Sequence, residues 1–299
     1  EQKEVSPMVK EYTDFLKFID DALEMAKSIP KHFSKFSNKI YCNHQKFTIY
    51  VLMQKFKTTT RGIVSILRSN SDMRILLGLT RVPVHSTIVR FVKKIRKQIN
   101  NLLDIRQADI VAIDATGFEL ESKSYYYRTV WNSNRRQKTK KFMKLSAVVD
   151  VDKQCILSFK IRKSRAHDMR DSEYLIKNLL FNKLLADKGY CSRKLRSYII
   201  RIKKAIPVIP IKGHTNFYGY YKNGRKIPGN DYPRRSIVEN IFFCIKTKYG
   251  SVLRNRSYAT QKVELISKLL AFNIDRKQYY LCLLFKGCTS ATNNKLYKH

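Results

Sequence analysis

The pattern of apolar residues changes near residue 108, and this change limits most strongly the folds that the chain can adopt. Residues 109–114, 142–151 and 155–161 are short runs rich in β-branched and aromatic residues, which is typical of strands. Asp152 and Lys153 separate the last two runs and predict a hairpin turn. Further along, strands are predicted at 183–187 and 205–211, and helices at 169–181, 192–204, 232–248 and 260–285.

Three strands joined by hairpins and followed by alternating helices and strands are typical of an RNase H-like fold. Such a fold is an α/β mixed sheet with helices on both faces. Pro207 and Pro210 interrupt the last predicted strand, so we expect this strand at an edge of the sheet. The predicted catalytic domain covers residues 106–286, and residues 287–299 are expected to form a loose tail.

The first 105 residues are predicted to form a separate, all-α domain. Apolar residues recur at helical spacing in five segments, 9–26, 47–56, 60–68, 73–79 and 87–100. Pro83 interrupts the chain before the last segment, and Ser86 is a candidate N-cap for it. A short helix, a turn and a basic helix resemble a DNA-binding helix-turn-helix. The candidate DNA-binding residues of the basic helix are Arg90, Lys93, Lys94 and Lys97, although a basic face of this kind is also common on solvated helices.

The charge of the chain indicates a polyanionic partner. Lys and Arg number 60 against 23 Asp and Glu, which leaves a net charge of +37, and 43% hydrophobic residues are enough to form a core. Nucleic acid is the commonest partner of so basic a protein, and a small-molecule enzyme is hard to reconcile with this charge. The N-terminal segment has no secretory character, and no apolar run approaches the ~18 residues of a membrane span. The six cysteines form no regular framework, which favours a reduced, cytoplasmic protein associated with the nucleoid.

Two aspartates follow short apolar strands. Asp114 ends the first predicted strand and Asp187 ends the fourth, and these two strands are neighbours in the predicted sheet. Functional groups of open α/β sheets gather at the carboxyl ends of strands. Two carboxylates at one site require a cation, and oxygen ligands suit Mg²⁺ or Mn²⁺. Taken singly, either aspartate has the simpler explanation that it ends a strand or caps a turn.

A third acid lies on the predicted helix 232–248. Arg235, Glu239 and Lys246 are spaced at i, i+4 and i+11, so they share one helical face. Glu239 can complete a metal site, and the two cations can hold phosphates beside it. An intrahelical Arg–Glu ion pair with no further role is the simpler alternative.

These residues carry a resemblance to the DDE insertion-sequence transposases. The spacing Y-x2-R-x3-E-x6-K at Tyr232, Arg235, Glu239 and Lys246 resembles the Y-R-E-K motif of this family. Asp114 lies in a D-x-T segment and Asp187 in a D-x-G-Y segment, which resemble the first and second aspartate motifs. Segments at 82–88, 166–168 and 270–276 also resemble the family, so the likeness covers roughly residues 45–280.

The resemblance implies a DNA transposase that binds terminal inverted repeats, cleaves the element ends and joins them to target DNA. It implies that Asp114, Asp187 and Glu239 bind two Mg²⁺ ions, for which Mn²⁺ can substitute, with Asp114 bridging the two ions. It also implies that Tyr232, Arg235 and Lys246 contact double-stranded DNA near the cleaved end. Arg234 lies beside Arg235, so only the motif spacing selects Arg235. Holding two ends together implies a homodimer in the synaptic complex.

The chain departs from some relatives in the length between its second and third acids. Asp187 and Glu239 are 52 positions apart, so a large inserted domain is absent or reduced to a small hairpin. The segment 122–141 joins the first two strands and interleaves cations with aromatic residues, which suits DNA. Its candidate DNA-binding residues are Trp131, Arg135 and Arg136, although a solvated loop with Trp131 as a packing anchor is equally consistent.

Two other functions compete with a transposase. The first is a catalytically inactive or repurposed DNA-binding protein, against which the presence of all three acids argues. The second is an RNase H-like nuclease, against which the predicted DNA-binding domain argues. All three functions predict DNA binding that weakens with salt.

Overall fold

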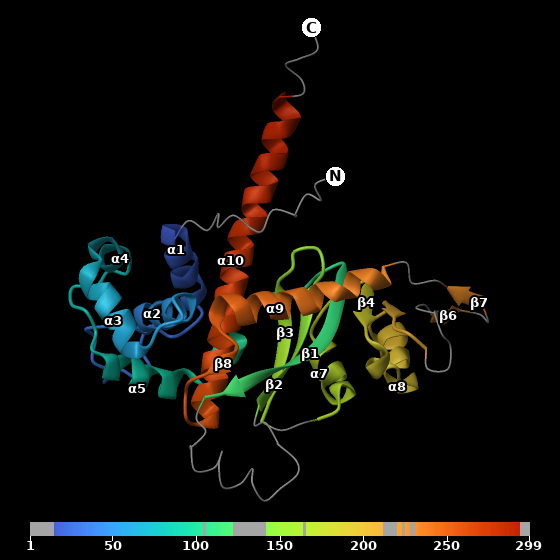
Figure 1. The fold of residues 1–299 in the computed structure, drawn as a ribbon, viewed down its shortest axis with the longest axis horizontal. Helices are drawn as coiled ribbons and strands as arrows, with labels where there is room; N and C mark the ends of the chain where they lie inside the picture. Colours follow the sequence, from blue (N-terminus) through green and yellow to red (C-terminus); the bar gives the residue numbers. More distant parts are fainter. Residues whose placement is uncertain are drawn as a thin grey trace, which may run out of the picture.

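The computed structural model describes residues 15–103, 106–121, 142–163, 166–211, 220–222, 225–227 and 231–293. They form an α/β structure in which a mixed sheet is flanked by helices and preceded by a group of N-terminal helices (Figure 1). The predicted fold class is confirmed. None of the described helices is both long enough and apolar enough for a membrane crossing.

Six strands make up the main sheet within the described residues, in the order β3-β2-β1-β4-β5, with β8 paired to the far end of β1. β1 is antiparallel to β2 and parallel to β4, β2 is antiparallel to β3, and β4 is parallel to β5. This is the RNase H-like arrangement, and it places β5 at the edge where its proline is tolerated. The strands are β1 Ile110–Leu120, β2 Phe142–Asp150, β3 Ile156–Arg162, β4 Lys183–Ala186, β5 Ile206–Val208 and β8 Val252–Leu253.

Helices cover both faces of the sheet because alternate residues of β1 point to opposite sides. Ala112 and Phe118 join a core cluster with α9 and α10, whereas Val111 and Ile113 join a second cluster with α7 and α8. The covering helices are α7 Ser172–Ile176, α8 Arg193–Ser197, α9 Ile237–Tyr249 and α10 Tyr258–Asn293. α9 ends at Gly250, whose φ of +87° is a conformation that favours glycine.

The N-terminal helices share a core with the sheet. α10 contacts α1, α2 and α5 as well as α9, and Figure 1 shows it between the N-terminal helices and the strands. The first core cluster therefore continues from Phe18 and Phe47 to Leu185 in the sheet. The helices are α1 Phe15–Ala26, α2 Asn43–Lys55, α3 Thr60–Ser69, α4 Ser71–Leu76 and α5 His85–Ile95.

Several element boundaries differ from those that the sequence predicts. β1 does not end at Asp114 but continues to Leu120, because its second half pairs with β2 throughout and with β8 at its end. α5 begins at His85, so Ser86 lies inside the helix and is not its N-cap. The helix predicted over 169–181 is a 3₁₀ turn followed by the short α7. α10 runs to Asn293, so residues 287–293 of the predicted loose tail are helical.

The region between the second and third acids contains a small hairpin. β6 Tyr220–Lys222 pairs antiparallel with β7 Arg225–Ile227 as a separate two-stranded sheet, which Figure 1 shows beyond β4. In the described residues of this region, the hairpin is all that corresponds to an inserted β domain. This agrees with the short spacing between Asp187 and Glu239.

Asn273 of α10 has a structural role that accounts for part of the C-terminal sequence motif. Its side-chain amide donates to the Ile156 carbonyl oxygen at 2.8 Å, and its Oδ1 accepts from the Ile156 N–H at 2.8 Å. The amide thus satisfies both backbone groups at the start of β3, a strand at the edge of the sheet. This pair of bonds attaches α10 to the sheet at a defined position.

A buried lysine makes stability depend on pH. Lys268 of α10 is 2% exposed and donates to the carbonyl oxygens of Gly250 and Val252, both at 2.8 Å. Burial nevertheless lowers the pKa of Lys268 from 10.5 to about 8. Above pH 8 the unfolded chain binds the proton more tightly than the folded chain, so the stability contributed by this group rises with pH.

We expect the unfolding free energy of the wild type, minus that of Lys268→Met, to rise by about 2–3 kcal/mol from pH 7 to pH 10. Urea denaturation at both pH values measures this difference. Comparing the two proteins cancels the titration of all other groups. A difference that does not change with pH would contradict the lowered pKa.

Candidate active site

Asp114 and Asp187 lie on neighbouring parallel strands. Ile113 of β1 pairs with Ala186 of β4, so the two aspartates occupy the next positions of the same register. Adjacent strands lie about 4.8 Å apart. Both side chains belong to the face covered by α9, because Ala112 and Leu185, two residues earlier on each strand, belong to the core cluster on that face. The topology therefore brings two acidic residues that are distant in sequence to adjacent register positions.

The opening of the sheet at this point comes from the unequal lengths of its strands. β4 ends at Ala186, and β8 rejoins β1 only at Glu119. Between them, β1 pairs with no other strand of the described residues on this side. Asp114 and Thr116 therefore lie on a continuous strand at a point where neither β4 nor β8 pairs with it, and Figure 1 shows α9 running across β1. A rigid central strand thus positions Asp114 more firmly than the strand end predicted from sequence.

Asp114 and Asp187 make the same local hydrogen bond, and Asp114 also lies near other negative charges. Asp114 Oδ1 accepts from the Ala115 N–H at 2.7 Å, and Asp187 Oδ1 accepts from the Lys188 N–H at 2.7 Å. Burial raises the pKa of Asp114, and the charges of Glu239 and Asp168 raise it further, against the opposing effects of the Ala115 N–H and Arg235. A desolvated carboxylate near other acids favours the approach of a cation.

The predicted helical face that carries Arg235, Glu239 and Lys246, called the α9 stripe below, lies along β1. Arg235 Nη1 is 3.6 Å from Asp114 Oδ2, and Arg235 Nη2 donates to Glu239 Oε1 at 2.7 Å. Lys246 Nζ donates to Thr116 Oγ1 at 2.6 Å, two residues beyond Asp114 on β1. Arg235 lies in a 3₁₀ turn, Tyr232–Ser236, that precedes α9. The stripe thus links both of its cations to the strand that carries Asp114.

The structure distinguishes the two adjacent arginines. Arg234 pairs with Asp152 in the turn between β2 and β3, whereas Arg235 reaches both Asp114 and Glu239. Burial differs as well, because the Arg235 side chain is 19% exposed and that of Arg234 is 43% exposed. Tyr232 is half-buried and packs against the core. Arg235 is therefore the arginine at the candidate site.

A buried tyrosine lies among the acids. Tyr190 is 1% exposed, and its hydroxyl has no hydrogen-bond partner among the described residues. Burial raises the pKa of Tyr190, and so do the charges of four nearby carboxylates. These are Asp168, Asp114, Asp171 and Asp187. Asp168 belongs to the segment 166–168 that resembles the family, and it pairs with the buried Lys144 of β2.

Thr116 and Lys144 are residues of this region that sequence reasoning did not assign. Thr116 carried a detectable signal, because it stands two residues after Asp114 and so faces the same side of a strand. Lys144 carried a weaker one, a lysine within an otherwise apolar strand. Other acids and His167 have local roles. Asp150 accepts from the backbone N–H groups of the following turn, and His167 caps the 3₁₀ helix Asp168–Asp171.

The residues present fit a divalent metal ion by their chemistry. Three carboxylates supply only oxygen donors, which Mg²⁺ and Mn²⁺ prefer. As the side chains lie, no three acidic, histidine or cysteine groups among the described residues are gathered closely enough to hold a metal ion. Arg235, which contacts both Asp114 and Glu239, supplies the positive charge between these carboxylates.

The other predicted sites separate into exposed, structural and undescribed residues. Arg90, Lys93, Lys94 and Lys97 are exposed on and just after α5. Trp131, Arg135 and Arg136 lie outside the described residues.

Cys42 accepts from the Gln45 N–H as the N-cap of α2, and His44 Nε2 lies 2.8 Å from the Ile29 carbonyl oxygen, so both have structural partners. Cys42, Cys155, Cys191 and Cys244 are free thiols.

A mixed sheet of this order, with Asp114 on β1, Asp187 directly after β4 and Glu239 on the covering helix α9, has the RNase H-like arrangement. Comparison with protein families makes the class narrower. Residues 105–274 match the family described as the transposase DDE domain, and residues 3–94 match a transposase domain (DUF772). The first match covers more than half of the chain, which therefore belongs to the DDE transposases, and the protein is a DNA transposase.

DDE transposases are metal-dependent enzymes. Among solved structures, the chain is similar to the piggyBac transposase in its cryo-EM synaptic complex with hairpin DNA. The two share 9% sequence identity with a TM-score of 0.49, over 89% of this chain and 73% of the other. Among curated proteins, no sequence matches the chain significantly.

Proposed function

We propose that this transposase binds the terminal inverted repeats of its element, cleaves the DNA at the element ends and joins those ends to target DNA. The proposal is supported chiefly by the position of Asp114 and Asp187 in one register, with Glu239 joined to Asp114 through Arg235. Two paired strands and a packed helix fix the backbone positions at which these acids lie before DNA arrives. Such preorganisation is what phosphoryl transfer requires of a protein.

Asp114, Asp187 and Glu239 are the residues that would hold two Mg²⁺ ions, for which Mn²⁺ can substitute. Divalent ions held by these carboxylates supply activation of the attacking oxygen and stabilisation of the leaving oxygen at phosphorus. The protein then needs no nucleophile of its own. The raised pKa of Asp114 is consistent with this role, because a cation restores the ionised form that burial disfavours.

Arg235, Lys246 and Tyr232 would position the DNA strand beside the acids. The guanidinium of Arg235 has five donors in a planar fork, so it can retain Glu239 while donating to a phosphate oxygen. Lys246 is held by Thr116 and acts as a point charge farther along β1. Coordinated cleavage of two ends also requires two active sites, so we propose that the protein acts as a homodimer on DNA. We also propose that it is a cytoplasmic protein associated with the nucleoid.

The test is a cleavage and strand-transfer assay with labelled DNA from the flanks of the gene. With Mg²⁺ we expect nicks at the element ends and joined products with target DNA. Removal of the metal by EDTA should abolish both, and Mn²⁺ should restore them. Specific end binding without cleavage in any metal would instead indicate an inactive or repurposed binding protein. Cleavage that ignores the end sequence would indicate a general nuclease.

A further inference from the structure

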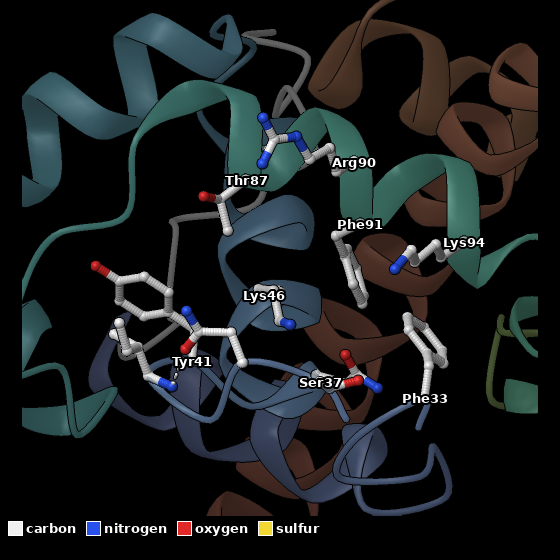
Figure 2. Close-up of a pocket in the computed structure, with 11 residues that line it drawn as sticks. Phe33, Ser37, Tyr41, Lys46, Thr87, Arg90, Phe91 and Lys94 are labelled. Atoms are coloured by element: carbon white, nitrogen blue, oxygen red, sulfur yellow. Dashed lines mark hydrogen bonds between the residues drawn. The ribbon is translucent and has the colours of Figure 1, made fainter. Parts of the chain in front are cut away.

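A basic pocket lies in the N-terminal helical region, away from the candidate active site. It has a volume of about 370 Å³ and is formed between α2, α5 and the segment that precedes α2 (Figure 2). This volume falls within the ~300–1,000 Å³ typical of small-ligand pockets. Three cations line it, Lys46 from α2 and Arg90 and Lys94 from α5, and no acidic residue is among its lining residues. The pocket therefore favours an anion.

The structure divides the basic stripe that the sequence predicts on α5. Arg90 and Lys94 line the pocket together with Lys46, whereas Lys93 and Lys97 do not. Figure 2 shows Arg90 and Lys94 on the helix above Lys46. Burial lowers the pKa of Lys46, and the nearby charge of Lys94 lowers it further against the opposing effect of Cys42. None of the three cations forms an ion pair with an acid in the described part of the chain.

The remainder of the pocket wall is aromatic and polar. Phe33 stacks on Phe91 with ring centroids 6.0 Å apart, and Lys46 Nζ lies 5.9 Å from the centre of the Phe91 ring. Tyr41 lines the pocket as well, and Figure 2 shows it apart from the Phe33–Phe91 pair. A group that fills this pocket must therefore present an anion to the cations and a flat, apolar part to the aromatic rings.

The pocket is held in shape by bonds that do not involve its cations. The backbone N–H of Asn43 donates to the Lys31 carbonyl oxygen, and its side-chain amide donates to the Pro30 carbonyl oxygen, both at 2.8 Å. These bonds attach the segment before α2 to the helix. Gln45 donates to the carbonyl oxygens of Leu77 and Gly78, which ties α2 to the chain leading into α5. A preformed pocket lowers the entropic cost of binding.

We propose that this pocket binds an unpaired nucleotide of a DNA strand, with its phosphate beside Lys46, Arg90 and Lys94 and its base against the aromatic wall. The inference rests on the proposed function, since it takes DNA as the ligand of this protein. Phosphate contacts by Lys and Arg fix position, and stacking on aromatic rings accepts any base. The contact is therefore independent of sequence and separate from cleavage.

The experiment measures equilibrium binding without divalent metal, using fluorescence anisotropy. The ligands are a single-stranded thymidine 20-mer and a 20-mer of abasic residues, which carry the same phosphates but differ in bases. Phe33→Leu should weaken binding of the thymidine strand by about fivefold or more and leave the abasic strand unchanged. Lys46→Met should weaken binding of both strands and reduce the magnitude of the slope of log K against log salt by about 0.7, the value for one phosphate contact on a single strand.

Lys39→Met is the matched control. Lys39 is exposed in the same segment but does not line the pocket, so the variant removes the same charge from the same region. Equal losses for Lys39→Met and Lys46→Met would overturn the proposal in favour of general electrostatic attraction. Equal effects of Phe33→Leu on the two strands, or none, would overturn the stacking. If Lys46→Met lowers the Tm markedly, Arg90→Met provides the same test at an exposed side chain.

A free nucleotide carries the same phosphate and base as a nucleotide of a DNA strand, so it is the alternative ligand of this pocket. Thymidine monophosphate should raise the Tm of the wild type only weakly. If it raises the Tm strongly, while Lys46→Met leaves strand binding unchanged, the pocket serves a free nucleotide and the proposal fails. Because every arm measures binding without metal, a wild type that does not cleave DNA would contradict the proposed function alone.

Discussion

Replacing Asp187 with Asn, or Glu239 with Gln, is expected to lower the rate of metal-dependent cleavage by about 10³-fold or more. Each change removes a charged oxygen donor from the candidate metal site and keeps the size of the side chain. Metal ions contribute several kcal/mol to the stabilisation of such transition states, and about 1.4 kcal/mol corresponds to a factor of ten in rate. Single-turnover cleavage of labelled end DNA measures the loss directly.

Asp114→Asn is expected to have the same effect on cleavage but a distinctive effect on stability. Burial raises the pKa of Asp114, so the ionised form is less favourable in the folded chain than in the unfolded chain at neutral pH. Asparagine carries no charge and avoids this cost. We therefore expect the free energy of unfolding at pH 7 to increase slightly while cleavage is lost, which urea denaturation tests.

Glu173→Gln is the control for the loss of an acidic charge. Glu173 belongs to α7 in the same domain, and its carboxylate pairs at 3.1 Å with Lys194, whose side chain is 81% exposed. Glu173→Gln should leave the cleavage rate within about a factor of two, because exposed ion pairs contribute little and Glu173 is not among the acids that act on Asp114 or Tyr190. Cleavage retained in Asp187→Asn and Glu239→Gln would exclude these residues as metal ligands.

Asp275→Asn is expected to destabilise the fold by about 3–5 kcal/mol. Asp275 of α10 is 5% exposed, and its carboxylate lies 2.5 Å from Lys55 Nζ of α2 and 2.8 Å from Lys248 Nζ of α9. It also accepts a hydrogen bond from the hydroxyl of Tyr249. The substitution removes the charge that attracts both ammonium groups, of which Lys55 has a 13% exposed and Lys248 a 34% exposed side chain. Loss of this attraction at a buried carboxylate is the source of the predicted destabilisation.

Lys277→Met on the same helix is the comparison for this prediction. Lys277 pairs with Asp21 at 2.6 Å, but its side chain is 59% exposed. Exposed ion pairs contribute about 0–1 kcal/mol, so this variant should be nearly neutral. Urea denaturation at pH 7 measures both variants. If Asp275→Asn costs no more than Lys277→Met, the carboxylate does not hold α2, α9 and α10 together.

The sheet was predictable because it depends on local patterns, and the same patterns place Asp114 and Asp187 at neighbouring positions. Short apolar runs and their order indicated the RNase H-like sheet, and the neighbouring positions of the first and fourth strands follow from that order. The α9 stripe was predictable too, because the spacing of Arg235, Glu239 and Lys246 places them on one helical face wherever the helix packs.

Other features depended on residues that are distant in sequence. The sequence predicted a strand that ends at Asp114, but pairing with β2 and β8 extends β1 to Leu120 and makes the aspartate part of a central strand. In the sequence, only the motif spacing separates Arg235 from Arg234. In the structure, Asp152 lies beside Arg234 and Asp114 lies beside Arg235. Neither partner is near in the chain.

The order of strands and helices can be predicted from the chain alone, as can its basic character and the three acids with their flanking cations. These properties arise from periodicity and composition, which depend on neighbouring residues. Long-range packing sets which side chains come into contact, such as Lys46 with Arg90 and Lys94 in one pocket, or Asp275 with Lys55 and Lys248. These contacts depend on how α10 packs between the N-terminal helices and the sheet, and packing between distant segments leaves no local pattern in the sequence.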